Sequence, residues 1–210
     1  MNVHRLLLRL VAPIVRLVAR RRLDDPWARY DYRAPLSAYG GGNRHEFAWY
    51  LEGESAVSVS SLDEVQGWLV ECEYVHDQVL FNEQDFWQHP RTFEQVRRGD
   101  CEDHALWAWR KLIELGMDAD LVAGSVLRGA TDVPDRGAGG HVWVNLRRDG
   151  ETFVFETVAK TKEHMLRPLA TVRDRYRPEF GVDREGRRFA FNGAIMAFRE
   201  NQGDATRRTA

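Results

Sequence analysis

The chain has 210 residues, of which 43% are hydrophobic and 30% charged, and its formal net charge is −2. This composition suits one soluble globular domain with an extension at each end. The small net charge argues against a nucleic-acid partner, and two cysteines are too few for a disulfide framework.

The N-terminal segment, residues 1–22, is basic and amphipathic. It holds six arginines and no acidic residue, which leaves 24 basic and 32 acidic residues elsewhere. Arg9 and Arg16 limit the apolar run between them to six residues, too short for a membrane span, and Pro13 interrupts the helical pattern. The segment also lacks the features of a secretory signal. It therefore lies either on an anionic membrane surface or on a partner protein or the chain's own body, and we expect a cytoplasmic protein, peripheral to the membrane in the first case.

Residues 23–60 read as an irregular, aromatic-rich approach, with one strand-like run at Phe47–Leu51 that would edge a sheet. The main domain is predicted over residues 61–200. A capping pattern at Ser61 opens a helix that we expect to continue to about Leu80. Cys72 falls on the apolar stripe of this helix, which indicates a structural thiol.

A second helix is predicted to begin at Cys101. Gly99 breaks the preceding segment, Asp100 can cap the helix, and Asp103 is placed as a weaker capping-box partner. The positive end of the helix favours a thiolate at Cys101. The flanking carboxylates of Asp100, Glu102 and Asp103 oppose it unless they point away, act as caps or are neutralised by a cation. We therefore expect His141 to do much of the activating, as an ion-pair partner of the thiolate.

A strand over residues 121–127 and a glycine-rich loop over residues 128–140 follow. The loop is either a mobile lid over a site or a long connecting loop without a functional role. A hairpin is predicted over residues 180–191, and residues 201–210 are expected to form a disordered tail.

Between these elements, residues 140–158 predict a β-hairpin around Asp149 and Gly150. Asp-Gly favours a two-residue type I′ turn, so that Arg148 pairs with Glu151 and the numbers of paired residues sum to 299. In this register His141 and Glu156 are diagonal neighbours on one face, with Cβ atoms roughly 7 Å apart. A slip of one residue would place them on opposite faces.

The order and intervals of several short motifs resemble the transglutaminase-like superfamily, and most closely its bacterial cysteine proteinases. The resemblance extends over about residues 62–160. The matching marks are Trp87 and Pro90, then residues 99–103, Leu115-Gly116-Met117 leading into residues 119–124, Gly140 to Val144, and Phe155-Glu156.

This resemblance implies an α+β, papain-like core, in which the nucleophile-bearing helix packs on an antiparallel β-sheet. It implies a triad of Cys101, His141 and Glu156, although the family's usual acid is aspartate. Gln95 lies six residues before Cys101, where papain-like enzymes place an oxyanion-hole glutamine. Some family members bind calcium through the positions of Asp100 and Glu102. No cofactor is expected to be required, and calcium is the candidate; a helix cap and a solvated carboxylate are the other interpretation of these two residues.

A thiol, an imidazole and a carboxylate are the groups of a cysteine acyl-transfer enzyme. The leading hypothesis is a cysteine peptidase or amide hydrolase acting on a protein or peptide. A transglutaminase, which transfers the acyl group to an amine, uses the same groups. A non-catalytic binding module on the same scaffold is the third hypothesis.

Overall fold

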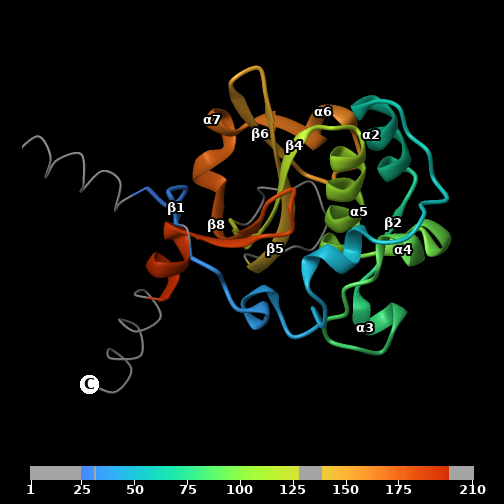
Figure 1. Ribbon diagram of the computed structural model, residues 1–210, viewed down its shortest axis with the longest axis horizontal. Helices are drawn as coiled ribbons and strands as arrows, with labels where there is room; N and C mark the ends of the chain where they lie inside the picture. Colours follow the sequence, from blue (N-terminus) through green and yellow to red (C-terminus); the bar gives the residue numbers. More distant parts are fainter. Residues whose placement is uncertain (1–24, 31, 128–138, 199–210) are drawn as a thin grey trace, which may run out of the picture.

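The computed structural model describes residues 25–30, 32–127 and 139–198, and places them in one seven-stranded antiparallel sheet and a group of helices (Figure 1). The strand order is β1-β9-β8-β4-β5-β6-β7. The strands are β1 (Arg29–Tyr30), β4 (Asp118–Val126), β5 (Gly139–Arg148), β6 (Glu151–Phe155), β7 (Leu166–Pro168), β8 (Tyr176–Val182) and β9 (Arg188–Phe191). Two further short strands, β2 (Glu73–Tyr74) and β3 (Arg98–Gly99), pair in parallel apart from this sheet.

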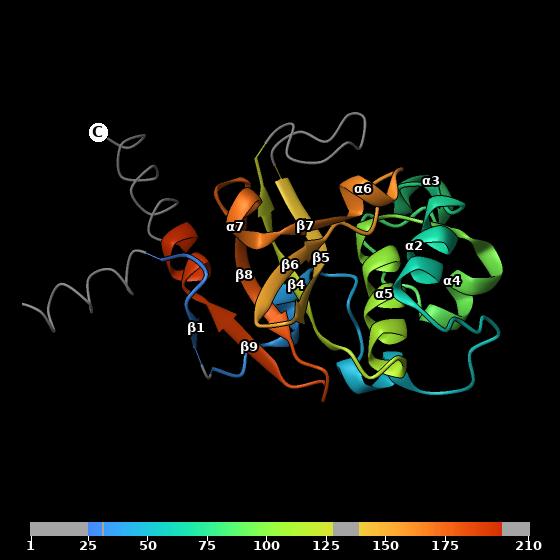
Figure 2. The same ribbon diagram turned by 90° about the horizontal axis from the view of Figure 1, so that it is seen from above.

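Helices α2, α4 and α5 gather on one side of the sheet, whereas α7 lies on the other (Figures 1 and 2). The helices are α2 (Leu62–Val70), α3 (Asp77–Leu80), α4 (Pro90–Val96), α5 (Cys101–Glu114), α6 (Lys162–Met165) and α7 (Leu169–Val172). The described residues also include three 3-10 turns, η1 (Leu36–Tyr39), η2 (Phe47–Leu51) and η3 (Arg173–Arg175), and residues 192–198 are helical. The predicted α+β class and the helix-on-antiparallel-sheet core are therefore confirmed.

Strand alternation divides the apolar residues into two clusters. On β5, Val142 and Val144 join the large core that contains α5, whereas Trp143 joins a smaller cluster with Tyr176 of β8. This is the alternation expected when both faces of a strand are covered. None of the helices in the described residues is long and apolar enough to cross a membrane.

The hairpin of β5 and β6 has the predicted register. Arg148 pairs with Glu151, and Val144 pairs with Phe155. Asp149 and Gly150 have φ values of 54° and 79°, as a type I′ turn requires. The ladder stops at Phe155, so the predicted sum of 299, which would pair Glu156 with Trp143, does not extend to Glu156.

Two sequence predictions for the earlier segments are wrong. The expected helix over residues 61–80 divides into α2 and α3, with β2 between them; Ser61 does cap α2, by accepting a hydrogen bond from the backbone N–H of Glu64 at 3.2 Å. The strand-like run Phe47–Leu51 is the 3-10 turn η2. Phe47 and Tyr50 are buried in the same core as α5, so the residues before position 61 contribute to the main core.

The predicted β4 and the hairpin of β8 and β9 are present, the latter with Phe180 opposite Ala190. Residues 1–22, most of the glycine-rich loop (residues 128–138) and the C-terminal tail (residues 201–210) lie outside the described residues. The predictions for these three segments therefore remain predictions.

Candidate active site

Cys101 is the first residue of α5 and faces the core, with 6% of its surface exposed. Asp100 occupies the N-cap position, but its side chain makes no cap hydrogen bond. Asp103 is no capping-box partner either, because its Oδ1 accepts a hydrogen bond from the backbone N–H of Gln88 at 2.8 Å. The Asp100 and Asp103 side chains therefore do not cap this 14-residue helix, and the positive end of the helix favours negative charge at the thiol.

His141 and Glu156 meet in the buried interior, as the hairpin register predicts. His141 Nε2 lies 2.9 Å from Glu156 Oε1 and 2.8 Å from Oε2, and both side chains are fully buried. An ionised carboxylate only accepts hydrogen bonds, so the proton is on Nε2. This leaves Nδ1 as the ring nitrogen that can serve Cys101.

The charge of His141 is governed by these neighbours. Burial by itself lowers the pKa of His141. The Glu156 carboxylate and Cys101 raise this pKa by a larger amount, so that it is about 9. His141 is therefore an imidazolium at neutral pH. Its positive charge offsets the carboxylates around Cys101, which disfavour a thiolate there.

Cys101 and His141 open on one cleft of about 730 Å³. The cleft also contains Asp85, Asp100, Glu102 and Glu179, and none of its described lining residues is lysine or arginine. Aromatic side chains form part of its wall, namely Tyr39, Tyr74, Trp87 and Phe180. A neutral or cationic substrate segment suits this lining better than an anionic one.

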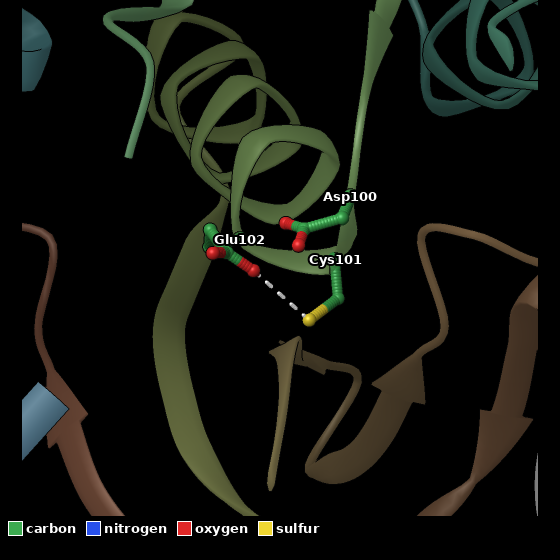
Figure 3. A group of neighbouring side chains, drawn as sticks. All are labelled: Asp100, Cys101 and Glu102. Carbon is green, nitrogen blue, oxygen red and sulfur yellow. Dashed lines mark hydrogen bonds between the residues drawn. The ribbon is translucent and has the colours of Figure 1, made fainter. Parts of the chain in front are cut away.

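Glu102 lies beside the thiol (Figure 3), and Cys101 Sγ donates to Glu102 Oε2 at 3.1 Å. Burial, with the neighbouring Cys101 and Asp100, raises the pKa of Glu102 well above its usual range. Glu102 is thus a buried group of the site, and the interpretation of it as a solvated carboxylate is wrong.

Two further carboxylates, Asp77 and Asp85, complete this acidic cluster. The carboxylate oxygens of Asp77, Asp85 and Glu102 lie within 4.8 Å of one another, as do those of Asp77, Asp100 and Asp103. Among the described residues, Asp77 Oδ1 and Asp100 Oδ1 are buried without a hydrogen-bond partner. Burial and the charge of Asp100 raise the pKa of Asp77 to about 7. Buried oxygens that lack a donor and repel one another suit a hard cation such as calcium.

Gln95 is not at the site. It is exposed on α4 and does not line the cleft, so the predicted oxyanion role of its side chain is wrong. The prediction rested only on the spacing between Gln95 and Cys101 in the sequence. In the structure, helix α4 (Pro90–Val96) directs the Gln95 side chain to solvent. The backbone N–H of Cys101 remains as an oxyanion donor.

Sequence reasoning did not identify Asp77, Asp85 or Tyr176 as site residues. Asp77 and Asp85 lie 24 and 16 residues before Cys101, outside any motif, and only the packing of α3 against β3 brings that segment to the site. Tyr176 begins β8, and its hydroxyl donates to Glu156 Oε2 at 2.9 Å. No local signal in the sequence distinguishes these residues.

Helix α5 carries the thiol, and the antiparallel strands that follow it in the chain carry the imidazole and lead to the acid. This is the papain-like, transglutaminase-like arrangement that the sequence resemblance implied. No protein-family model and no curated protein matches the sequence.

Several solved structures superpose on part of this chain. LapG of Legionella pneumophila superposes with a TM-score of 0.47 at 17% identity, over 62% of this chain and 66% of LapG, just under two thirds of that protein. Its calcium-bound form gives a TM-score of 0.44 at 19% identity, over 70% of this chain and 78% of that one. An arylamine N-acetyltransferase of Bacillus cereus, described with a unique Cys-His-Glu catalytic triad, gives a TM-score of 0.40 at 15% identity, over 59% and 51%. At this level of similarity, function has to be argued from the site itself.

Proposed function

We propose that the protein is a cysteine peptidase or amide hydrolase that acts on a protein or peptide substrate. The observation that carries this proposal is the buried pair of His141 and Glu156, which opens with Cys101 on one cleft. Glu156 fixes the ring and leaves Nδ1 for the thiol, the geometry that activates a cysteine nucleophile.

The steps follow from these three side chains. The Cys101 thiolate attacks the substrate carbonyl carbon, and the oxyanion is held by the Cys101 backbone N–H. The C–N bond breaks while the His141 imidazolium gives its proton to the leaving amine. His141 then takes a proton from water, the hydroxide adds to the thioester carbonyl, and the C–S bond breaks. The carboxylic acid leaves, and the Cys101 thiolate and the His141 imidazolium are restored.

Calcium is the candidate cation of the acidic cluster. Asp77, Asp85 and Glu102 form one group that would hold it, and Asp100 lies in two overlapping groups, one with Glu102 and the other with Asp77. When bound, it would neutralise carboxylates that otherwise disfavour a thiolate at Cys101. Two observations support this assignment: the buried oxygens without partners and the raised pKa of Glu102.

Hydrolysis and transamidation are distinguished by the fate of the acyl group. The wild type and Cys101→Ala are incubated with a glutamine-rich protein and a labelled primary amine, with calcium and with a chelator. We expect the wild type to produce new protein N-termini or to release ammonia, without incorporation of the label. Cys101→Ala should show neither product. Incorporation of the amine would instead make the protein a transglutaminase.

A binding module remains the third function to be tested. The readout needs no substrate: alkylation of Cys101 by iodoacetamide reports the activation of the thiol directly. If Cys101 reacts no faster than Cys72 with or without calcium, and His141→Ala makes no difference, the protein is not a cysteine hydrolase.

A further inference from the structure

The carboxylate of Glu156 needs support from outside its own strand. The β5–β6 ladder ends at Phe155, so Glu156 is not held by cross-strand pairing with β5. Its backbone N–H donates instead to the carbonyl of Met165 at 2.7 Å. A glutamate also has one more rotatable bond than an aspartate, and more freedom to lose when both oxygens face His141.

Tyr176 supplies a contact at the far side of this carboxylate. It is 2% exposed at the start of β8, and its hydroxyl donates to Glu156 Oε2 at 2.9 Å. Its ring packs edge-on against Trp143, with ring centroids 5.2 Å apart, and Trp143 lies 6.0 Å from the His141 ring. The tyrosine is thus fixed by packing in the position from which it reaches the acid.

Arg167 of β7 sets the direction of this hydrogen bond. Its Nη2 donates to the Tyr176 hydroxyl oxygen at 2.9 Å. A guanidinium has no acceptor, so the tyrosine oxygen accepts there and its own proton is directed to Glu156. Burial, with the charge of Glu156, raises the pKa of Tyr176 far above its usual range, so the hydroxyl stays a donor.

We infer that Arg167 and Tyr176 are positioning residues, which hold the Glu156 carboxylate against His141 through the series Arg167 to Tyr176 to Glu156. The inference rests on the proposed function, because positioning matters for the reaction only if the triad is catalytic. Four side chains from four segments of the sheet region then act as one unit, with the cation of Arg167 at its outer end. A hydrogen-bonded series of this kind is stronger than its separate pairs.

The test compares Tyr176→Phe, Arg167→Met and Arg167→Lys with the wild type. Two quantities are measured in each: the rate of Cys101 alkylation, and the pKa of His141 by NMR of its ring protons. Tyr176→Phe should slow alkylation by roughly ten- to hundredfold, the size of a hydrogen bond to a charged group, and lower the pKa of His141. Arg167→Met should also slow alkylation and change the pKa of His141, and Arg167→Lys should recover most of the loss in rate because it keeps a donor cation.

Tyr30→Phe is the matched control. Tyr30 lies on β1 at the opposite edge of the sheet from β7, and its hydroxyl donates to Asn192 Oδ1 at 3.4 Å. This variant removes a tyrosine hydroxyl without touching the site, so the His141 pKa and the alkylation rate should remain those of the wild type. The double variant Tyr176→Phe/Arg167→Met should be no worse than Tyr176→Phe alone, since both changes act on the same carboxylate.

The inference is overturned if Tyr176→Phe and Arg167→Met leave the His141 pKa unchanged, even if both lower the melting temperature. If Tyr176→Phe does not fold, the Met and Lys variants of Arg167 decide, because Arg167 is only partly buried. Failure of the proposed function looks different. In that case Cys101 would show no activated alkylation in the wild type, while the His141 pKa would still report whether Tyr176 and Arg167 act on Glu156.

Discussion

At the scale of single residues, the two cysteines should differ sharply in reactivity. Burial raises the pKa of Cys72 to about 11, so little thiolate exists there at neutral pH. Cys101 lies at the N-terminus of α5 with the His141 imidazolium nearby. We expect iodoacetamide to label Cys101 on the order of a hundredfold faster than Cys72 at pH 7.5. Mass spectrometry of partly labelled protein measures both rates in one sample, and His141→Ala should slow only Cys101.

His141 also predicts a pH dependence of stability. Its pKa is about 9 in the folded protein and 6.5 as a free side chain, so the folded state binds this proton more tightly. The stabilisation is complete below about pH 6.5 and is lost as the pH rises through about 9. Urea unfolding at pH 6, 8 and 10 should therefore show a steeper fall for the wild type than for His141→Gln. Parallel curves for the two proteins would mean that His141 gains no proton on folding.

The sequence predicted the residues of the proposed triad, and the structure places His141 against Glu156, but the sequence could not identify the side chains that support them. Cys101, His141 and Glu156 belong to local patterns: a helix start, a strand and a turn that fixes the register. Asp77 and Tyr176 reach the site only through packing of segments distant in the chain. Gln95 shows the opposite error, because its spacing from Cys101 fits a known pattern while the helix α4 exposes its side chain.

At the scale of elements, the turn at Asp149 and Gly150 controls the alignment of His141 with Glu156. Gly150 has a φ of 79°, and a Cβ added there would meet nothing within 4 Å. Gly150→Ala should therefore cost about 1 kcal/mol of stability through the backbone alone, without a steric clash. Urea unfolding measures this cost.

Gly41→Ala is the control for this substitution. Gly41 also has open space around an added Cβ, but no positive φ, so its replacement should be neutral. An equal loss in the two variants would show that the cost is not specific to the turn. Cys101 alkylation should be retained in folded Gly150→Ala, because the register is preserved.

Local chemistry explains which elements could be predicted. The Asp-Gly turn and the Ser61 cap are each decided by a few adjacent residues, and both are confirmed. The break after α2 and the 3-10 turn at Phe47–Leu51 are decided by distant partners. Cys72 to Tyr74 leaves the helical path where β2 pairs with β3, and Phe47 fills the core beside α5. Tertiary packing overrides the local pattern at both places.

At the scale of the whole molecule, we expect the acidic cluster to make the stability of the fold depend on a bound cation. Its carboxylates come from α3, from the segment before α4 and from the start of α5, so a bound calcium ion would tie three segments together. Calcium at a hundred times its dissociation constant should add about 2.7 kcal/mol to the free energy of unfolding. Thermal unfolding with calcium or with a chelator measures the shift, independently of any activity.

This prediction is tested with variants that remove a negative charge from the acidic cluster, and with a control variant that removes one from another part of the chain. Asp100→Asn and Glu102→Gln should abolish the calcium-dependent rise in melting temperature, and should themselves raise the stability of the metal-free protein by relieving repulsion among buried carboxylates. Asp149→Asn removes one acidic charge from the hairpin turn, where asparagine is equally suitable, and should keep the full calcium shift. A calcium shift that persists in Asp100→Asn and Glu102→Gln would place the ion elsewhere. Magnesium, which keeps its water ligands more strongly, should give a smaller shift than calcium at the same concentration.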